Sequence, residues 1–300
     1  TVNGCSGNPM TITGTGRAAV YVQIADPAAV CYPNTVDLTD PAIKTGSASG
    51  LTFTYWTDIF GSVALNNPST VGVTGVYYIK GTTADECFSI KPVNVTVHAL
   101  PAAPTAGNVT VAYDGSAHSA SATAPAGAHV TWYTASSGGT STVAPNATNA
   151  GTYTAYAESV DDVTGCVSAT RTLVTLQINK AVLTVTADPQ SKIYGAVNPT
   201  LTFQYSGWQN LDNESSLDTP PSASTTVTVA TAVGVHSGAI TVAGGVDNNY
   251  SFSYIAADFT VTRATLTVTA DAKSKVYGAV NPSLTVQYSG WQNADGVGNL

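Results

Sequence analysis

Apolar and small polar residues alternate along most of the chain with a period of two. The pattern is clear in "VNVTVHA" (93–99), "LTVTAD" (183–188) and "STTVTVATAV" (224–233). Such alternation is typical of strands with one buried face, and Val, Thr and Tyr suit a pleated surface. Turn residues recur every eight to twelve residues or so, and no stretch of twelve shows a helical period. We therefore predict an all-β chain of short strands.

One long stretch of the sequence occurs twice. Residues 183–210 and 266–293 start 83 positions apart and share 23 of 28 residues by direct count. A period of this length is too long for solenoid coils of about 20–30 residues, and it suits one sandwich domain per period. The sequence thus predicts a tandem array of β-sandwich domains.

Composition and charge narrow the range of functions. Charged residues make up only 9% of the chain, against about 25% in ordinary soluble domains. The net charge is −8 and the ten basic residues are scattered, whereas nucleic-acid binding requires clustered Lys and Arg. No apolar run approaches the roughly 18 residues of a membrane span. We expect neither nucleic-acid binding nor direct membrane insertion.

Four blocks of sequence, in a fixed order, carry a family resemblance. They are "K-x-Y-G-x-x-N-P-x-L-T", "YSGW", "VGVHSGAITVAGG" and "NNYSFSYIAADFTVTRA". Together they resemble the MBG family, which consists of bacterial immunoglobulin-like repeats marked by Tyr–Gly and found in large surface proteins and adhesins. The resemblance covers 181–263 fully and 264–300 in part. This chain departs from the family at Gly234-Val235-His236, where Gly-x-Tyr is usual.

The sequence before residue 181 resembles other bacterial immunoglobulin-like domains. Residues 31–87 are similar to domains of giant secreted or surface adhesins of Bacteroidetes-type bacteria, and 111–166 to a repeat marked by Tyr–Asp–Gly. Both hold an aromatic pair and a later Gly-x-Tyr, which predict a core Trp on a central strand and a Tyr that fixes a strand corner through its hydroxyl. These residues are Tyr55-Trp56, Trp132-Tyr133, Gly75-Val76-Tyr77 and Gly151-Thr152-Tyr153.

These patterns predict an array of immunoglobulin-like β-sandwich domains, divided into five segments. The junctions near 178–181 and 261–264 are short, so we expect little bending between neighbours and a semi-rigid rod. The opening residues look like the end of a strand-rich domain, and we expect the chain to be a piece of a longer protein. The segments are 1–25 (the end of a preceding domain), 26–100, 101–180, 181–263 and 264–300 (the start of a second MBG-type repeat).

The four cysteines follow the domain spacing. Cys5, Cys87 and Cys166 each precede a closing strand, and Cys31 opens the segment that Cys87 ends. We therefore predict a Cys31–Cys87 disulfide and with it an oxidising, extracellular setting. Cys5 would then have its partner outside the sequence, and Cys166 would be a free buried thiol.

Candidate catalytic groups are sparse. The four histidines are far apart in sequence and lie in three predicted domains, and none has a nucleophile at a known spacing. The acidic pairs Asp85-Glu86 and Asp161-Asp162 fall in predicted turns, whereas glycoside hydrolysis by paired carboxylates needs a cleft. We predict that the protein is not an enzyme.

We expect no cofactor, with calcium as the one alternative. "NLDNES" (210–215), "DNN" (247–249) and Asp161-Asp162 offer oxygen ligands near domain ends, where calcium would stiffen a rod. Asp and Asn are also common turn residues because they hydrogen-bond their own backbone. No loop pattern of a known calcium site is present.

The predicted function is structural. We expect a non-catalytic stalk or spacer of a large secreted or cell-surface bacterial adhesin-like protein, whose partners are neighbouring domains of the same chain and which could self-associate into filaments. The alternative is a set of glycan- or protein-binding modules accessory to an extracellular enzyme or filament. Trp208 and Trp291, in the turn-like "YSGWQN", are the candidate binding aromatics, although their repetition is equally consistent with packing at every domain junction.

Overall fold

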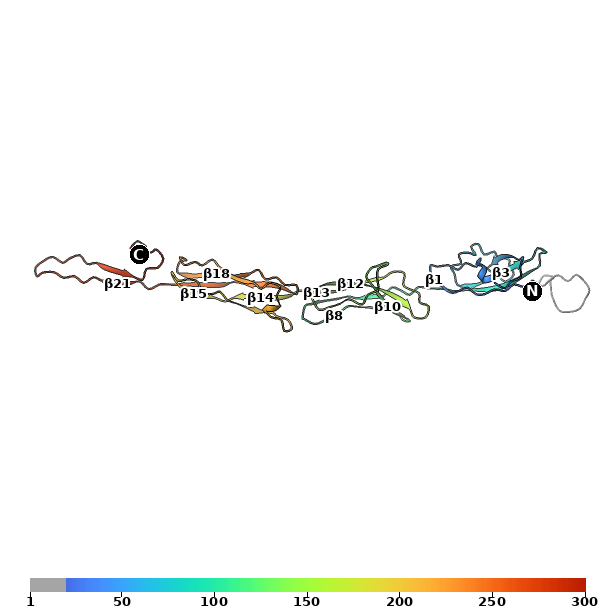
Figure 1. The fold of residues 1–300 in the computed structure, drawn as a ribbon, viewed down its shortest axis with the longest axis horizontal. Coiled ribbons are helices and arrows are strands. Elements are labelled where there is room, and N and C mark those ends of the chain that lie inside the picture. The colour runs from blue at the N-terminus through green and yellow to red at the C-terminus, as the bar shows by residue number, and fades with distance from the viewer. Residues whose placement is uncertain (1–19) are drawn as a thin grey trace, which may run out of the picture. The chain divides into compact units, whose positions relative to one another are not determined.

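The computed structural model describes residues 20–300, and in that range the chain is built of strands (Figure 1). The helical turns described there are three 3-10 turns of four residues or fewer: η1 (Pro41–Lys44), η2 (Glu214–Ser216) and η3 (Val297–Asn299). The all-β prediction is confirmed. The described residues form two compact units, one of 20–107 with 121–144 and 154–174, the other of 108–120, 145–153 and 175–300.

The strands of residues 26–100 form two small sheets in the first unit. An antiparallel sheet has the order β2-β3-β4, and β1 pairs in parallel with β5. Ile79 of β3 and Val93 and Val95 of β4 face inward. They pack with Val36 and Leu38 in one buried cluster. The strands are β1 (Val30–Cys31), β2 (Thr52–Trp56), β3 (Gly75–Thr82), β4 (Phe88–Val95) and β5 (Val97–His98).

Residues 101–180 hold eight strands. The main sheet has the order β10-β12-β13-β7, and the pairs β11-β8 and β6-β9 complete the segment. The strands are β6 (Thr105–Gly107), β7 (Val109–Ala112), β8 (His118–Ser119), β9 (Ser121–Thr123), β10 (Ala128–Tyr133), β11 (Asn146–Ala147), β12 (Gly151–Asp161) and β13 (Thr172–Asn179).

Residues 181–263 form a sandwich of two sheets. The orders are β16-β14-β19 and β15-β20-β18-β17, and both sheets contribute to one buried cluster that contains Val185, Ile240 and Phe259. The strands are β14 (Ala181–Ala187), β15 (Gln190–Ile193), β16 (Phe203–Ser206), β17 (Ser222–Thr225), β18 (Gly234–Ala243), β19 (Tyr250–Ile255) and β20 (Ala257–Thr262).

The repeated sequence produces the same pairing in both copies. Strand β14 pairs with β16 so that Thr184 faces Ser206. Strand β21 (Thr267–Ala270) pairs with β22 (Val286–Ser289) so that Thr267 faces Ser289, each partner being 83 residues further on. Among residues 20–300, every sheet draws its strands from a single one of the segments 26–100, 101–180, 181–263 and 264–300. The segment 1–25 lies almost wholly outside the described residues.

The two predicted tyrosine corners are present, and a third corner, in residues 181–263, has a histidine in place of the tyrosine. The hydroxyls of Tyr77 and Tyr153 each donate to the carbonyl four residues earlier, at 3.0 and 3.1 Å. His236 occupies the equivalent place in β18, and its Nε2 lies 2.8 Å from the carbonyl oxygen of Ala232, also four residues earlier. An imidazole N–H thus replaces the phenol as the corner donor.

The predicted central-strand tryptophans are edge residues instead. Trp56 lies on β2 and Trp132 on β10, and each strand is at the edge of its sheet. Both indoles are half-buried, and Trp56 Nε1 donates to Thr54 at 2.9 Å. The alternation that predicts a buried face is the same for edge and central strands, which is why the sequence did not separate them.

Two substitutions at His236 test whether its hydrogen bond stabilises the strand corner. His236→Ala should speed amide exchange in the first half of β18 and lower local stability by about 1 kcal/mol, because a typical hydrogen bond is lost. His236→Tyr should restore protection by supplying the hydroxyl of the other corners. Hydrogen exchange on the full chain measures both, and an alanine variant as protected as the tyrosine variant would contradict the role of the bond.

Candidate functional site

A cluster of bonded polar and aromatic side chains in the second unit lies where residues 101–180 meet residues 181–263. Its centre is the Asp212 carboxylate, whose Oδ2 accepts the hydroxyl of Tyr113 at 3.0 Å and that of Tyr250 at 2.8 Å. The Tyr250 hydroxyl in turn accepts the backbone N–H of Gln209 at 2.8 Å. We call Tyr113, Trp208, Asp212 and Tyr250 the aromatic junction.

The rings of the aromatic junction pack edge to face. The centroid of Tyr250 lies 5.6 Å from that of Tyr113 and 5.4 Å from that of Trp208, with interplanar angles of 80° and 83°. Tyr205 packs on the other side of Trp208 at 5.0 Å. The T-shaped geometry of the two pairs that include Tyr250 is one of the arrangements that aromatic pairs favour, whereas Tyr205 and Trp208 are tilted by 45°. Trp208, a candidate binding aromatic, is therefore half-buried within a ring cluster, and its ligand-binding role stays a prediction.

Burial sets the protonation of these hydroxyls. It raises the pKa of Tyr250 above its usual range, and the Asp212 carboxylate adds to the shift while the Gln209 N–H opposes it. Burial followed by Asp212 raises the pKa of Tyr113 in the same way. Burial and the Glu214 carboxylate raise the pKa of Tyr205 to about 12. A raised pKa keeps these phenols protonated, and therefore donors, to higher pH than an ordinary tyrosine, whose pKa is about 10.

Further bonds cross the same junction. The backbone N–H of Ala150 donates to Asn249 Oδ1 at 2.8 Å, and Asn249 Nδ2 donates to Asn149 at 3.3 Å. Lys180, at the junction itself, donates to the carbonyl of Asp247 at 2.7 Å. Sequence reasoning missed Tyr113, Asp212 and Tyr250 as a group, because they are separated by up to 137 positions.

The Tyr–Gly stretch at 191–198 is held by local bonds. Lys192 is almost fully buried, and its Nζ donates to the carbonyls of Ala196 at 3.1 Å and Thr228 at 2.6 Å. Asn198 Nδ2 donates to Val227 at 2.6 Å. In the second copy Lys275 makes the same bond to Ala279, at 3.2 Å. The motif side chains tie down their own loops.

Trp291, the other candidate binding aromatic, lines a cavity of about 240 Å³. The cavity is shared with Tyr194 of the preceding repeat and with Gln292 and Asp295. Trp291 is half-buried and packs against Tyr288 at 5.5 Å. Its surroundings match those of Trp208 in kind, and a ligand-binding role for it stays a prediction.

The predicted Cys31–Cys87 disulfide is wrong. Cys31 is bonded to Cys166, with the two Cα atoms 5.7 Å apart, and Cys87 is itself disulfide-bonded. Cys31 faces His98 across the β1–β5 pair, whereas Cys87 precedes β4. Eleven residues of largely extended chain separate positions 87 and 98, on the order of 30 Å, so Cys31 and Cys87 lie at opposite ends of their segment.

The observed disulfide joins two different predicted segments. It ties residues 26–100 to residues 101–180, and Cys166 is 1% exposed. Cys166 is thus buried as expected but is not a free thiol. Cys5 lies outside the described residues.

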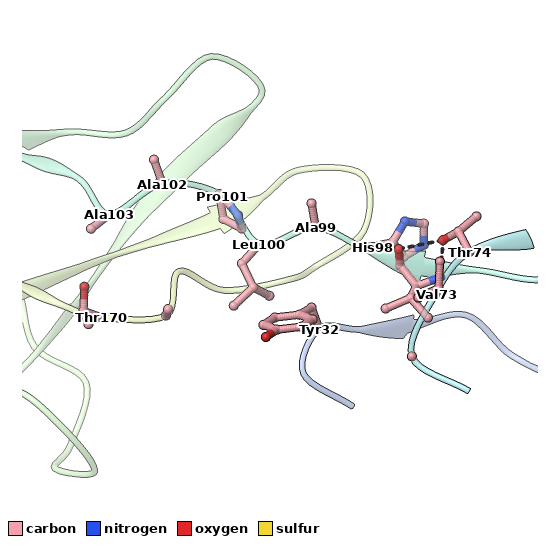
Figure 2. A pocket seen from close by; sticks show the side chains of 13 residues that line it. Tyr32, Val73, Thr74, His98, Ala99, Leu100, Pro101, Ala102, Ala103 and Thr170 are labelled. Atoms are coloured by element: carbon pink, nitrogen blue, oxygen red, sulfur yellow. Dashed lines mark hydrogen bonds between the residues drawn. The ribbon is translucent and has the colours of Figure 1, made fainter. Parts of the chain in front are cut away.

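A cavity of about 560 Å³ lies beside this disulfide in the first unit. It is lined by the residues around 97–103 together with Tyr32, Thr74 and Thr170, and Figure 2 shows Leu100 pointing toward the side on which Tyr32 lies. Thr74 Oγ1 and Val97 exchange hydrogen bonds of 2.9 and 2.8 Å at its wall. The lining offers one imidazole, from His98, and is otherwise largely apolar.

Asp85-Glu86 lies in a turn, and Asp161-Asp162 lies where β12 ends and a turn begins. The Thr164 backbone N–H and hydroxyl and the Val163 N–H, all donating to Asp161, hold the pKa of that carboxyl below its usual value. Asp162 pairs with His129 at 2.6 Å. Within residues 20–300 no three acidic, His or Cys side chains gather as a metal site would require. Calcium binding stays an untested alternative.

Two family models match the chain, and their bounds follow the repeated sequence and the segment before it. The family described as MBG domain (YGX type) matches residues 183–260 and 266–300. The family described as Ig-like domain CHU_C associated matches residues 101–179. The chain carries MBG-type repeats preceded by an immunoglobulin-like domain. Residues 181–263 are accordingly called the first MBG repeat and 264–300 the second.

Several solved structures also match the chain, with TM-scores below 0.5. Titin domains I67–I69 in an E-to-A variant are 10% identical, cover 81% of this chain and 96% of their own, and give a TM-score of 0.31. Mouse cadherin-23 EC22–24 is 12% identical and covers 83% of this chain and 98% of its own, with a TM-score of 0.27. The N-terminal four Ig domains of Dscam1 isoform 9.44, with zinc, are 16% identical and cover 81% of this chain and 73% of their own, with a TM-score of 0.23. No curated protein matches the chain.

MBG and immunoglobulin-like domains are typically non-catalytic modules of extracellular or surface proteins. Among the described residues, no helix has the length and apolar character to span a membrane.

The Cys31–Cys166 bond can be tested by peptide mapping. Digestion of the unreduced protein should release the peptide of Cys31 linked to that of Cys166, since the Cα separation is in the ordinary disulfide range. Mass spectrometry before and after reduction identifies the pair. A dominant Cys31–Cys87 peptide would overturn the assignment.

Proposed function

We propose that this chain is a structural stalk segment of a large secreted or cell-surface bacterial adhesin-like protein and is not an enzyme. The observation that carries the proposal is that successive junctions are closed by bonds across them. A disulfide joins 26–100 to 101–180, and the aromatic junction joins 101–180 to the first MBG repeat. A spacer needs such ties, since torque and tension pass through every junction in turn.

Two kinds of tie contribute on different scales. In the chain-entropy model, closing the 135-residue Cys31–Cys166 loop stabilises the folded state by about 5 kcal/mol. A hydroxyl bonded to a carboxylate contributes about 1.5–3 kcal/mol, and Asp212 receives two. Either tie is large relative to the stability of one small domain, about 5–15 kcal/mol.

Composition supports a role in contact with solvent over a long surface. Only 9% of the residues are charged, and the alternating Thr and Ser on outward strand positions keep the surface hydrated without strong attraction to neighbours. The partners in this proposal are the adjoining domains of the same polypeptide. The disulfides fit an oxidising, extracellular location.

Small-angle scattering on the full chain tests the spacer proposal. Each domain should add about 30–40 Å of reach, and the maximum dimension should grow accordingly, with little sign of flexing. Reduction of the disulfides serves as the comparison, because it should broaden the distance distribution without unfolding the first MBG repeat. A compact particle, or a broad distribution already present before reduction, would contradict the proposal.

A further inference from the structure

The Tyr–Gly mark of each domain lies at the place where the next domain begins. We define the mark as Tyr113-Asp114-Gly115 in residues 101–180 and as Tyr194-Gly195 in the first MBG repeat. The strand before each mark runs parallel to the last strand of its domain, β7 with β13 and β15 with β20. Each mark Tyr then donates its backbone N–H to the final strand, Tyr113 to Asn179 and Tyr194 to Thr262, both at 2.8 Å.

A second feature, the receiving loop, comes from the next repeat along the chain. It comprises residues 205–212 in the first MBG repeat and 288–295 in the second, both with "YSGWQN". Gly207 and Gly290 have φ of 101° and 98°, and a Cβ on either would lie 2.6 or 2.5 Å from the carbonyl oxygen of Val182 or Thr265. The loop is thereby packed against Val182 of β14 in the first repeat and against Thr265, just before β21, in the second, in each case next to the junction.

Mark and receiving loop meet without space for a side chain. A Cβ on Gly115 would lie 2.6 Å from the Cβ of Asn210. A Cβ on Gly195 would lie 2.6 Å from the Cβ of Gln292 and 2.5 Å from its Oε1. Real Cβ atoms do not approach so closely, and the Cβ atoms of Asn210 and Gln292 are not flexible ends that can move aside. The mark glycine therefore contacts the receiving loop at both junctions, through Asn210 at the first and through Gln292, one motif position earlier, at the second.

The aromatic parts of mark and loop also correspond. Tyr113 reaches Asp212 of the first receiving loop through its hydroxyl. Tyr194 lines one cavity with Trp291 and Asp295 of the second loop, and these two residues are Trp208 and Asp212 shifted by 83 positions. The donor domains differ, one immunoglobulin-like and one MBG.

We propose that the Tyr–Gly mark is a docking element whose partner is the receiving loop of the MBG repeat that comes next in the same chain. The mark glycine lets Asn210 or Gln292 of the loop approach closely. The mark tyrosine bonds the loop Asp at the first junction and lines one cavity with the loop Trp and Asp at the second. The two kinds of domain present the same docking element, so either can precede an MBG repeat. The proposal deepens the spacer function and rests on it for its biological purpose, while the docking itself is local.

A third mark provides a matched control for the glycine. Gly278 has φ +81°, close to the +83° of Gly195, so a Cβ at either position meets the same backbone strain. A Cβ on Gly278 would meet nothing within 4 Å, whereas one on Gly195 would meet Gln292. If the glycine serves only its own turn, Gly195→Ala and Gly278→Ala should behave alike.

Hydrogen exchange on the full chain tests the docking. Gly195→Ala should raise the exchange rate of the amides of Trp291, Gln292 and Asn293 by about tenfold or more, the factor for losing about 1.4 kcal/mol. Gly278→Ala should leave those amides unchanged. Equal rates in the two variants, whether raised or unaltered, would overturn the proposal.

A hydroxyl deletion decides the case if Gly195→Ala unfolds its own repeat, which exchange in β18 and β20 would reveal. Tyr113→Phe should raise exchange at Gln209–Asp212, and Tyr77→Phe, which removes a corner hydroxyl elsewhere, should not. Unchanged exchange in Tyr113→Phe would then overturn the proposal. Local exchange and scattering are independent readouts. If the variants change exchange in the receiving loop but scattering shows a compact particle, only the spacer proposal is rejected. If exchange in the loop does not change but the particle is elongated, only the docking proposal is rejected.

Discussion

The parallel pairing of an early strand with the last strand of each domain is the constraint on which the rest depends. It occurs as β7 with β13 and as β15 with β20. Because the last strand leads directly into the next domain, the loop after the early strand is held at the exit of the chain. In both domains that loop is the Tyr–Gly mark. The backbone thus fixes the mark beside that exit through its bond to the last strand.

The chain closes its junctions by two different kinds of chemistry. Between 26–100 and 101–180 the tie is covalent, from Cys31 to Cys166. Between 101–180 and the first MBG repeat it is the Asp212 carboxylate, which accepts two tyrosine hydroxyls from the buried Tyr113 and Tyr250. Burial makes the second tie effective, because an unpaired polar group there would be costly. A disulfide depends on the redox setting, whereas the aromatic junction does not.

Sequence alone predicts the parts of this architecture that are local or repeated. The period of two identified the strands, the 83-residue repeat predicted one sandwich domain per period, and Gly-x-Tyr predicted the corners. His236 shows the logic of the corner, since an imidazole N–H replaces the phenol and the bond persists. The family resemblance located the repeats, and the structure explains the motif: Lys192 and Asn198 fasten their own loop.

What sequence did not predict is pairing across long separations. Four cysteines allow three sets of pairs. The pairing that forms depends on the fact that Cys31 and Cys87 lie at opposite ends of residues 26–100. Trp56 and Trp132 show the alternation of a buried face, which does not distinguish an edge strand from a central one. Asp212 looked like a turn residue, and its role arises only when Tyr113 and Tyr250 come together.

Residual dipolar couplings test most directly whether the aromatic junction holds its two domains as one body. Couplings from the strands of 101–180 and from those of the first MBG repeat should fit a single alignment tensor in the full chain. They should continue to do so at high salt, because buried bonds are screened little. Two tensors of clearly different magnitude would show that the domains reorient independently, and would contradict the central claim that the junction is a stiff, bonded link.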